Sequence, residues 1–475
     1  MSQTSQDEPA AQVTAPPGSD RLTGSIIVVA VVSAISGLLY GYDTGIISGA
    51  LLQIGDDFGI AHLWEQVIAA SILVGAVIGA LTCSRLAERR GRHGTLLLIG
   101  IVFVVGAVAA SLSPDPVTLS LSRLVLGFAV GGATQTAPVY VAELAPSAYR
   151  GRLVLFFQIA IGVGIVIATI VGAAEVIDWR VSIGMAAVPA ALMFVLMLRL
   201  PESPRWLARE GHADRAREAL ARVRHPDSDL SAELAEIQEN VRAEKQASTR
   251  GWAGLKEAWV RPALVVGCGL AVFTQLSGIE MIVYYSPTIL TDNGFSDSTA
   301  LRVSVALGVT YLVAQLIGLA IIDRVGRRRL TLVTLPFAAL ALIVLGSFFV
   351  TGNDGKSMIP WIIGTLIAFM AFTAGGIQLM GWLTGSEIYP LATRAAGAAA
   401  QSASLWGTNV LITLTLLSIM KAIGTGQTFW MYALFNIIAF VFLYRKMPEL
   451  TGRSLEQIED HLAKGKFQPA DFASR

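Results

Sequence analysis

Two residues of opposite charge, Asp43 and Arg123, lie within long stretches of the sequence that are otherwise almost free of charge. Asp43 is about 27 Å along a helix counted from Ser25, and Arg123 is about 10 Å from the start of another apolar stretch. A buried carboxyl group beside a guanidinium can exchange its proton for that partner, which is the minimum chemistry for proton coupling. The alternative is a static ion pair.

Three charged motifs of the first half of the chain recur, in the same order, in the second half. They are Glu88–His93 and Asp323–Arg328, the pairs Glu143/Arg150 and Glu387/Arg394, and Pro201–Ser203 and Pro448–Leu450. Their similar offsets predict two homologous halves. Such halves are typical of transporters that hold a substrate between them near the bilayer midplane.

These motifs combine Gly-containing turns, flanking arginines and glutamates, which can form bidentate charge pairs. Pairs that are made in one conformation and broken in another would bias the equilibrium between the two. The alternative is that the charges only set the topology. The candidate gating charges are Arg89, Arg92, Glu143, Arg150, Glu202 and Arg205 in the first half, and Arg324, Arg327, Glu387, Arg394 and Glu449 in the second.

The composition requires an apolar environment around these charges. Of the 475 residues, 54% are hydrophobic and 15% are charged, and the mean hydropathy is +0.62. Twelve stretches are long enough to cross a hydrocarbon core of about 30 Å as helices. They are Leu22–Leu52, Gln66–Ser84, Gly94–Pro114, Pro116–Ala142, Leu153–Ala174, Val181–Leu198, Pro262–Thr291, Val303–Ile322, Leu330–Asn353, Ser357–Ser386, Ala395–Met420 and Ala422–Tyr444.

We therefore predict an all-α membrane protein with twelve transmembrane helices in two pseudo-symmetric six-helix bundles. The expected organisation is a disordered cytoplasmic tail (1–23), an N-terminal bundle (24–200), a cytoplasmic linker (201–260), a C-terminal bundle (261–446) and a cytoplasmic tail (447–475). Apolar residues at helical spacing between Asp214 and Lys245 favour short amphipathic helices in the linker over a polar coil. Arginines gather in alternate loops, which predicts that both termini are cytoplasmic.

The same composition excludes several classes of protein. A net charge of +1 provides no basic surface for nucleic acid. The five His and two Cys form no cluster at zinc-ligand spacing, and both cysteines lie inside apolar stretches, which argues against a disulfide framework. No nucleophile stands with a base. We expect no metal, no cofactor and no enzymatic activity.

Several motifs together resemble the sugar porter family of the major facilitator superfamily. They are the Gly-Arg turns at 88–93 and 323–328, Pro201–Leu207, Gln275–Ile279 followed by Tyr284–Pro287, and Thr451–Glu456. The resemblance extends from about Gly24 to Glu459 and implies the major facilitator fold. The stretch Gly41–Gly45 resembles that of proton-coupled bacterial members, which supports the proton-coupling role of Asp43 and Arg123.

The resemblance also implies where a sugar would bind. Residues matching family positions that contact sugar are Gln158, Gln275, Glu280, Trp382 and Trp406, and Gln378 is added as a replacement for a lost contact. Amide and carboxyl groups bind hydroxyl groups, and flat aromatic rings pack against sugar C–H groups. The alternatives are interhelical hydrogen bonds for the glutamines and packing for the tryptophans. Ser277-Gly278 favours a local break between Gln275 and Glu280.

Some positions depart from the family pattern, which puts the particular sugar in doubt. Thr274 stands where a second Gln is usual and Glu280 where Asn is usual, so Glu280 is a second candidate proton carrier. Leu405 stands where a polar residue often precedes the Trp, and the stretch 375–382 lacks the usual prolines.

These observations predict a proton-coupled symporter for a monosaccharide or polyol that works by alternating access. The alternatives are a passive sugar uniporter, a symporter for inositol or another small polyol, and a non-transporting sensor, which the short C-terminal tail disfavours. The expected partners are a small sugar or polyol, protons and the lipid bilayer. We expect a monomer in a plasma membrane, of the bacterial inner-membrane type.

Overall fold

The computed structural model describes residues 23–146, 149–174, 176–246, 251–351, 358–390, 392–451, 453 and 455–472. The regular elements in these ranges are helices, and they form twelve segments long and apolar enough to cross a membrane. This confirms the predicted all-α membrane fold. The predicted N-terminal tail lies, except for Thr23, outside the described residues.

The first half contributes six of the spans, and its sixth span is made of two consecutive helices. Its elements are α1 (Gly24–Phe58), α2 (His62–Arg90), α3 (Arg92–Ser111), α4 (Pro116–Leu144), α5 (Arg150–Gly172), α6 (Trp179–Gly184) and α7 (Ala187–Met197). The linker then forms α8 (Pro204–Arg209), α9 (Ala213–Val223), α10 (Leu230–Gln246) and α11 (Gly251–Gly254).

The second half repeats this arrangement, but two of its six spans are interrupted. Its elements are α12 (Arg261–Leu276), α13 (Ile279–Asp292), α14 (Asp297–Val325), α15 (Arg327–Val350), α16 (Ile359–Ala374), α17 (Ile377–Glu387), α18 (Arg394–Ile423) and α19 (Thr425–Lys446). The chain continues with α20 (Leu455–Ala463) and a short 3-10 helix, Pro469–Phe472.

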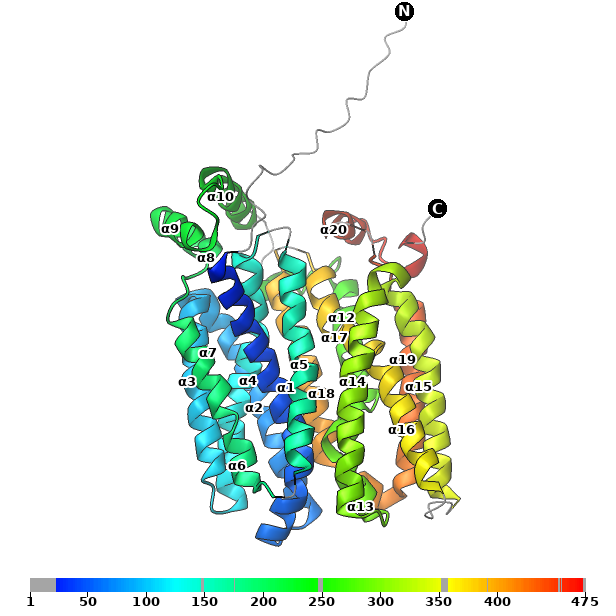
Figure 1. Ribbon diagram of the computed structural model, residues 1–475. Coiled ribbons are helices and arrows are strands. Elements are labelled where there is room, and N and C mark those ends of the chain that lie inside the picture. Colours follow the sequence, from blue (N-terminus) through cyan, green and yellow to red (C-terminus); the bar gives the residue numbers. More distant parts are fainter. Residues whose placement is uncertain are drawn as a thin grey trace, which may run out of the picture.

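The linker helices and α20 gather at one end of the molecule, beside the start of α1 (Figure 1). We call this end the linker end and the opposite end, where α1 runs into α2, the distal end. Thr23 fastens the start of α1 to the linker, because its hydroxyl donates to the Val223 carbonyl at 2.9 Å. α20 also packs on the bundle: Ile458 and Leu462 are buried beside Phe472.

The linker contains the predicted amphipathic helices. In α9, Ala216 and Ala219 are buried against Leu207 of α8, and Leu234 of α10 packs on the same cluster. The charged faces of α9 and α10 remain exposed. The preference for helices over a polar coil is therefore confirmed.

Within the first half, a row of glycines brings α1 close to α5. Gly37, Gly41, Gly45 and Gly49 recur every fourth residue, so they share one face of α1. At Gly41 a β-carbon would overlap the carbonyl oxygen of Ile161 on α5. Small residues at this spacing allow membrane helices to approach at backbone contact. This close packing fixes the helix that carries Asp43.

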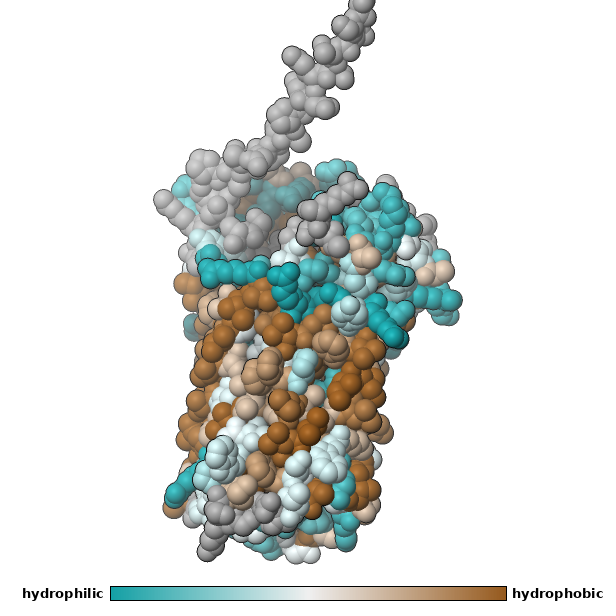
Figure 2. Space-filling model, turned by 90° about the vertical axis from the view of Figure 1, so that its right-hand side faces the viewer, coloured by the Kyte–Doolittle hydropathy of each residue, from teal (hydrophilic) through white to brown (hydrophobic). Residues whose placement is uncertain are grey.

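The outer surface is apolar around the middle and polar at the linker end (Figure 2). Large apolar side chains of the membrane-spanning helices, such as Leu121, Ile170 and Leu411, are more than half exposed. A soluble protein rarely exposes so continuous an apolar surface. The band is the surface expected to face lipid.

Equivalent glycines stand directly before α3 and α15, and both have backbone angles that strongly favour glycine. Gly91 has φ +92° and Gly326 has φ +97°. A glutamate caps each helix: Glu202 accepts from the backbone N–H of Arg92 at 2.9 Å, and Glu449 accepts from that of Arg327 at 2.9 Å. The sequence repeat is thus reproduced by the same capping contact in both halves.

Replacing Gly91 with alanine tests this cap. The new β-carbon would overlap the Glu202 carboxylate, and the backbone angles at this position are strained for alanine. We expect Gly91→Ala to lower the free energy of unfolding by about 2–4 kcal/mol, measured by chemical denaturation in detergent.

Gly94→Ala is the matched control. Gly94 lies in α3, the helix that follows Gly91, and nothing lies within 4 Å of a β-carbon built on it. Alanine is the better helix former, so Gly94→Ala should be neutral or stabilising by up to about 1 kcal/mol. Equal losses in the two variants would contradict the cap.

Candidate functional site

Asp43 and Arg123 meet inside the first half, as their depths predicted. The Arg123 Nη2 atom lies 3.5 Å from Asp43 Oδ2, and both side chains are almost fully buried. Arg123 Nε also donates to the Ile68 carbonyl on α2 at 3.0 Å. Arg123 Nη1 has no hydrogen-bond partner within the protein. The pair is therefore in contact but leaves hydrogen-bonding capacity unused.

A tyrosine of the second half reaches this pair. Tyr284 of α13 lies beside the Thr44 side chain, and its hydroxyl is also close to Asp43 and Arg123. Thr44 in turn donates to the Tyr40 carbonyl on α1 at 2.9 Å. The ion pair thus lies beside the interface between the halves.

The seventh span breaks where the sequence predicted, between Gln275 and Glu280. α12 ends at Leu276 and α13 begins at Ile279, with Gly278 at φ +96°. The break removes a helical partner from the Ser277 carbonyl, which instead accepts from the Asn436 amide of α19 at 2.8 Å. Satisfying the freed backbone group inside the protein makes such a break tolerable at membrane depth.

Glu280 is the centre of a polar cluster between the helices of the second half. The side chains of Gln378 from α17 and Asn409 from α18 both lie near its carboxyl group. Tyr311 of α14 contacts Gln378 and lies near Glu280. Glu280 and Tyr284 are one helical turn apart on α13, so the cluster is continuous with the contact to Thr44.

Several buried amides near this cluster keep an atom without a hydrogen-bond partner in the protein. These atoms are Gln158 Nε2, Gln275 Oε1, Gln378 Oε1 and Asn409 Nδ2. The four side chains are at most 6% exposed. Buried polar atoms are normally satisfied, so a set of open ones is the expected mark of a site that binds hydroxyl groups.

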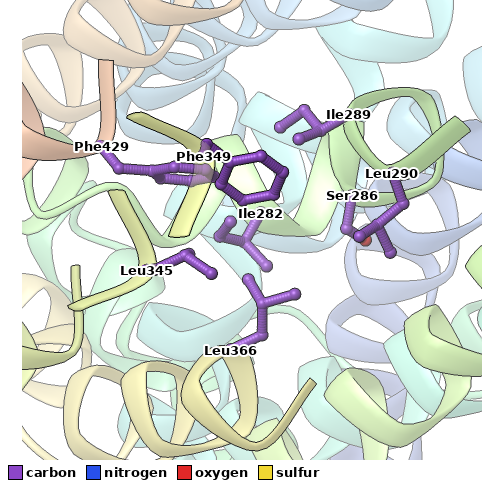
Figure 3. Close-up of a pocket in the computed structure, with 8 residues that line it drawn as sticks. All are labelled: Ile282, Ser286, Ile289, Leu290, Leu345, Phe349, Leu366 and Phe429. Carbon is purple, nitrogen blue, oxygen red and sulfur yellow. The ribbon is translucent and has the colours of Figure 1, made fainter. Parts of the chain in front are cut away.

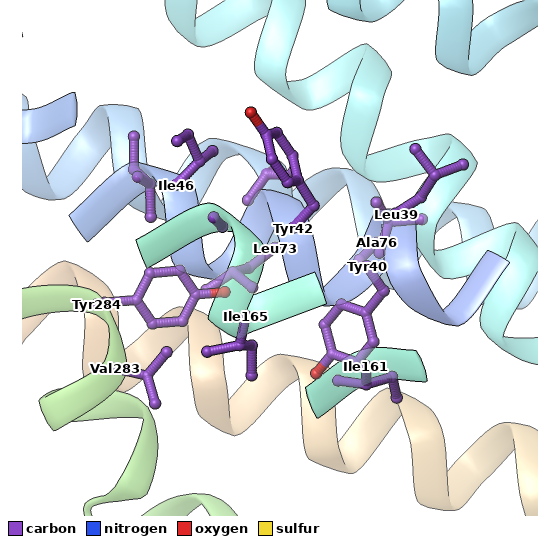
Figure 4. Packing of buried hydrophobic residues seen from close by; sticks show 14 of the residues in the cluster. Leu39, Tyr40, Tyr42, Ile46, Leu73, Ala76, Ile161, Ile165, Val283 and Tyr284 are labelled. Atoms are coloured by element: carbon purple, nitrogen blue, oxygen red, sulfur yellow. The ribbon is translucent and has the colours of Figure 1, made fainter. Parts of the chain in front are cut away.

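The tryptophans complete the set of sequence-predicted site residues. Trp406 of α18 is fully buried and meets Tyr40 of α1 edge to face, with ring centroids 5.2 Å apart. Tyr40 and Tyr284 lie beside Ile161 and Ile165 of α5 (Figure 4). Rings from both halves therefore meet close to the polar cluster. The Trp382 side chain, on α17, lies outside the described side chains.

A separate cavity lies within the second half and is almost wholly apolar (Figure 3). It is lined by Ile282, Leu345, Phe349 and Phe429 among others. Its one hydroxyl, that of Ser286, already pairs with Ser304 at 2.9 Å. This cavity lacks the open polar atoms that a sugar requires.

At the linker end, the first half binds its charges to one another. Arg92 forms an ion pair with Glu143: its Nη2 donates to Oε1 at 3.0 Å, and its Nε lies 2.9 Å from Oε2. Its Nη1 donates to the Ala87 carbonyl at 3.1 Å. Glu202 also accepts from the backbone N–H of Arg92. Arg92 therefore joins α2, α3 and α4 at the linker end to the segment after α7.

The second half repeats this cluster. Arg327 Nη2 donates to Glu387 Oε1 at 3.1 Å, and its Nη1 donates to Asp323 at 2.6 Å. Glu449 accepts from the backbone of Arg327 and also from the Thr451 hydroxyl, at 2.8 Å. Both clusters tie together helices of one half, rather than joining the two halves.

The remaining candidate gating charges differ in their exposure and in their contacts. Arg89 and Arg324 are exposed, and Arg205 is half-buried in α8. Arg394 donates through Nε to the Tyr389 carbonyl at 3.2 Å. The Arg150 side chain lies outside the described side chains.

Contacts between the halves occur at both ends. At the distal end, Gln66 donates to the Ser418 hydroxyl at 3.0 Å, and His62 lies 3.6 Å from Asp292. Toward the linker end, Gln135 donates to Ser402. Polar side chains thus join the two halves both at the distal end and toward the linker end.

Comparisons with known proteins agree with this architecture. A family model described as "Sugar (and other) transporter" matches residues 29–462. The chain belongs to the sugar porter family of the major facilitator superfamily. The resemblance read from the motifs is confirmed, and the protein is a membrane transporter rather than an enzyme.

Individual sugar porters match over nearly their whole length. The D-xylose transporter of Levilactobacillus brevis is 37% identical over 90% of this chain and 93% of its own, and the major myo-inositol transporter IolT of Bacillus subtilis is 34% identical over 91% and 93%. The xylose transporter XylE from E. coli, in a partially occluded inward-open conformation, covers 91% of this chain and 100% of its own with TM-score 0.78 and 26% identity. A structure of XylE, titled a proton:xylose symporter, bound to 6-bromo-6-deoxy-D-glucose has TM-score 0.76 at 25% identity and covers 93% of this chain and 99% of its own. The major facilitator fold is therefore confirmed.

The geometry adds residues to the candidate site that the sequence analysis did not select. Asn409 lies three residues after Trp406, a spacing that places both on neighbouring positions of one helix face. Tyr284 had been noted only as part of a motif, although its four-residue spacing from Glu280 indicates a shared face. Tyr311 carried no comparable sequence signal.

A double-mutant cycle tests the Asp43–Arg123 contact. Arg123→Leu leaves a buried carboxyl group without its cation and should cost about 3–5 kcal/mol of unfolding free energy. The same substitution in an Asp43→Asn background should cost at least about 1 kcal/mol less, because no charge remains to be compensated. Chemical denaturation in detergent gives both values. Identical costs would mean that the two side chains are not coupled.

Proposed function

We propose that this sugar porter couples the inward movement of protons to the transport of a monosaccharide or polyol. The Asp43–Arg123 contact carries the proposal. Asp43 is a buried carboxyl group whose ion contact at 3.5 Å is longer than a good charge-assisted hydrogen bond. A proton on Asp43 would release Arg123, whose Nη1 has no hydrogen-bond partner in the protein.

A path of polar contacts links this pair to the polar cluster around Glu280. Asp43 is next to Thr44, Thr44 contacts Tyr284, and Tyr284 lies one turn from Glu280. Protonation of Asp43 would alter the charges that hold Tyr284 in place. The occupancy of the polar cluster and the protonation of the pair can therefore influence one another, which is what coupling requires.

Alternating access follows from how the charges are distributed. Each half ties its own linker end together through Arg92 or Arg327, so each half can move as a unit. The polar contacts described between the halves, such as Gln66 with Ser418 and His62 with Asp292, each join a single pair of side chains and can separate. Rocking of one half against the other would open the cluster to either end in turn.

We place the linker end in the cytoplasm of a bacterial inner membrane. The arginine-rich turns at Arg89–Arg92 and Arg324–Arg329 and the charged linker all lie at this end. Loops rich in Arg and Lys remain on the cytoplasmic side. Both termini are then cytoplasmic, and the distal end faces the outside. Nothing in this mechanism requires more than one copy of the chain.

Asp43→Asn tests the coupling. In proteoliposomes with an imposed proton gradient, the variant should lose accumulation of radiolabelled sugar against its gradient, since its amide cannot carry the proton. Exchange of sugar between the two sides should remain measurable.

Asp115→Asn is the matched control for this experiment. Asp115 caps α4 at the distal end, and the backbone N–H of Thr118 holds the pKa of its carboxyl group below the usual value. Asparagine is an equally good cap, so accumulation should be normal. Retained accumulation in Asp43→Asn would remove the assignment of Asp43 as the proton carrier. An absence of proton-driven uptake in the wild type would instead favour a passive uniporter.

Gln275→Ala tests the position of the sugar. The Gln275 amide is buried beside the helix break with an open oxygen, so its loss should weaken sugar binding by about 1–3 kcal/mol. The readout is the affinity for a panel of pentoses, hexoses and inositols, which also distinguishes a sugar from an inositol transporter.

Gln53→Ala provides the control, because its amide binds the Ile177 carbonyl near the distal end of the first half. That variant should bind as the wild type does. Unchanged affinity in Gln275→Ala would move the binding site away from the break.

A further inference from the structure

Gln315 of α14 is a buried amide whose capacity for hydrogen bonds is entirely unused. Its side chain is 0% exposed, and neither Oε1 nor Nε2 has a hydrogen-bond partner within the protein. A polar group at membrane depth is costly unless it is paired. Each such group in a folded protein requires a specific explanation.

Gln315 lies on the same face of α14 as Tyr311, which belongs to the polar cluster around Glu280. Tyr311 lies one turn earlier on α14 and contacts Gln378, which in turn contacts Glu280. Residues four apart share a helix face, so Gln315 continues the face of Tyr311. It lies about 6 Å further toward the linker end.

The first half faces Gln315 from the opposite side. A β-carbon built on Gly162 of α5 would be 2.7 Å from Gln315 Oε1, so the absence of a side chain there leaves room for the amide. Gln158 lies one turn from Gly162 on the same face of α5, and its Nε2 is also without a partner. Two incompletely bonded amides, one from each half, thus flank the same interface.

A purely structural role does not account for this arrangement. A structural amide in this protein looks different: Gln401 donates to the Gly381 carbonyl at 2.8 Å and accepts from the Tyr389 hydroxyl at 3.1 Å. The Leu312 side chain, which also comes from α14 and lies close to Gly162, is apolar. Both polar atoms of the Gln315 amide thus remain without a hydrogen-bond partner within the protein.

We propose that Gln315 binds a hydroxyl group of the transported sugar or polyol, opposite Gln158, and helps to select the substrate. The inference rests on the proposed function. A hydroxyl group both donates and accepts, so it satisfies an amide oxygen or an amide N–H. Because the two amides belong to different halves, a hydroxylated substrate between them favours the closed arrangement of α5 and α14.

The test compares Gln315→Leu with the wild type and uses hydroxyl deletions in the ligand. Binding of D-xylose, D-glucose, D-galactose and myo-inositol to purified protein first identifies the best ligand. Monodeoxy analogues of that ligand are then measured. The wild type should lose about tenfold in affinity for one particular analogue. Gln315→Leu should lose about tenfold for the parent sugar and nothing further for that same analogue.

Thermal stability separates this role from a structural one. Leucine of similar size replaces an amide that makes no bond, so Gln315→Leu should unfold at the wild-type temperature or above. Gln401→Leu, which breaks existing hydrogen bonds, should unfold at a lower temperature. Gln315→Asn keeps an amide and should retain discrimination against the same analogue.

Three results would overturn the proposal. They are an affinity loss in Gln315→Leu that is equal for every analogue, an unchanged affinity for the parent sugar, and a fall in unfolding temperature comparable to that of Gln401→Leu. Failure of the wild type to bind any of the four ligands would instead overturn the proposed function, and this inference with it.

Discussion

The structure depends on how polar groups are accommodated at membrane depth, where water is not available to satisfy them. Most are paired within the protein: Arg123 with Asp43 and Ile68, and the Ser277 carbonyl with Asn436. A few amides around Glu280 are not fully paired. This contrast points to the amides around Glu280 as the groups that a bound ligand would satisfy.

The scaffold brings the site together through close helix packing rather than through polar bonds. The glycine row on α1 lets this helix contact the backbone of α5, so Asp43 and Gln158 are carried by two helices in direct contact. The interrupted seventh span then brings Glu280 from the other half near Tyr40 of α1. The candidate groups for recognition and for proton binding are thus carried by neighbouring segments.

The sequence predicted the spans well, because charge-free stretches of this length have few other uses. The sequence selected Glu202 and Glu449 as gating charges from the duplicated motif, but their role as caps of α3 and α15 became evident only in the structure. Gln315, Tyr311 and Asn409 were missed because a polar residue in an apolar helix looks the same whether it faces a neighbour or a substrate. That distinction depends on the closure of the two halves. The packing of Ile458 and Leu462 against the bundle was likewise hidden in a segment expected to be a tail.

The position of Glu202 in the chain bears on how the protein is assembled during synthesis. This residue follows the sixth span, yet it caps a helix that begins at Arg92 and is therefore made much earlier. The cap at the linker end of the first bundle can form only once the last span of that bundle has left the ribosome. Glu449 gives the second bundle the same dependence on its final span. Each bundle thus completes its own cap after its own last span. The cap of the first bundle can form before translation of the second bundle is over.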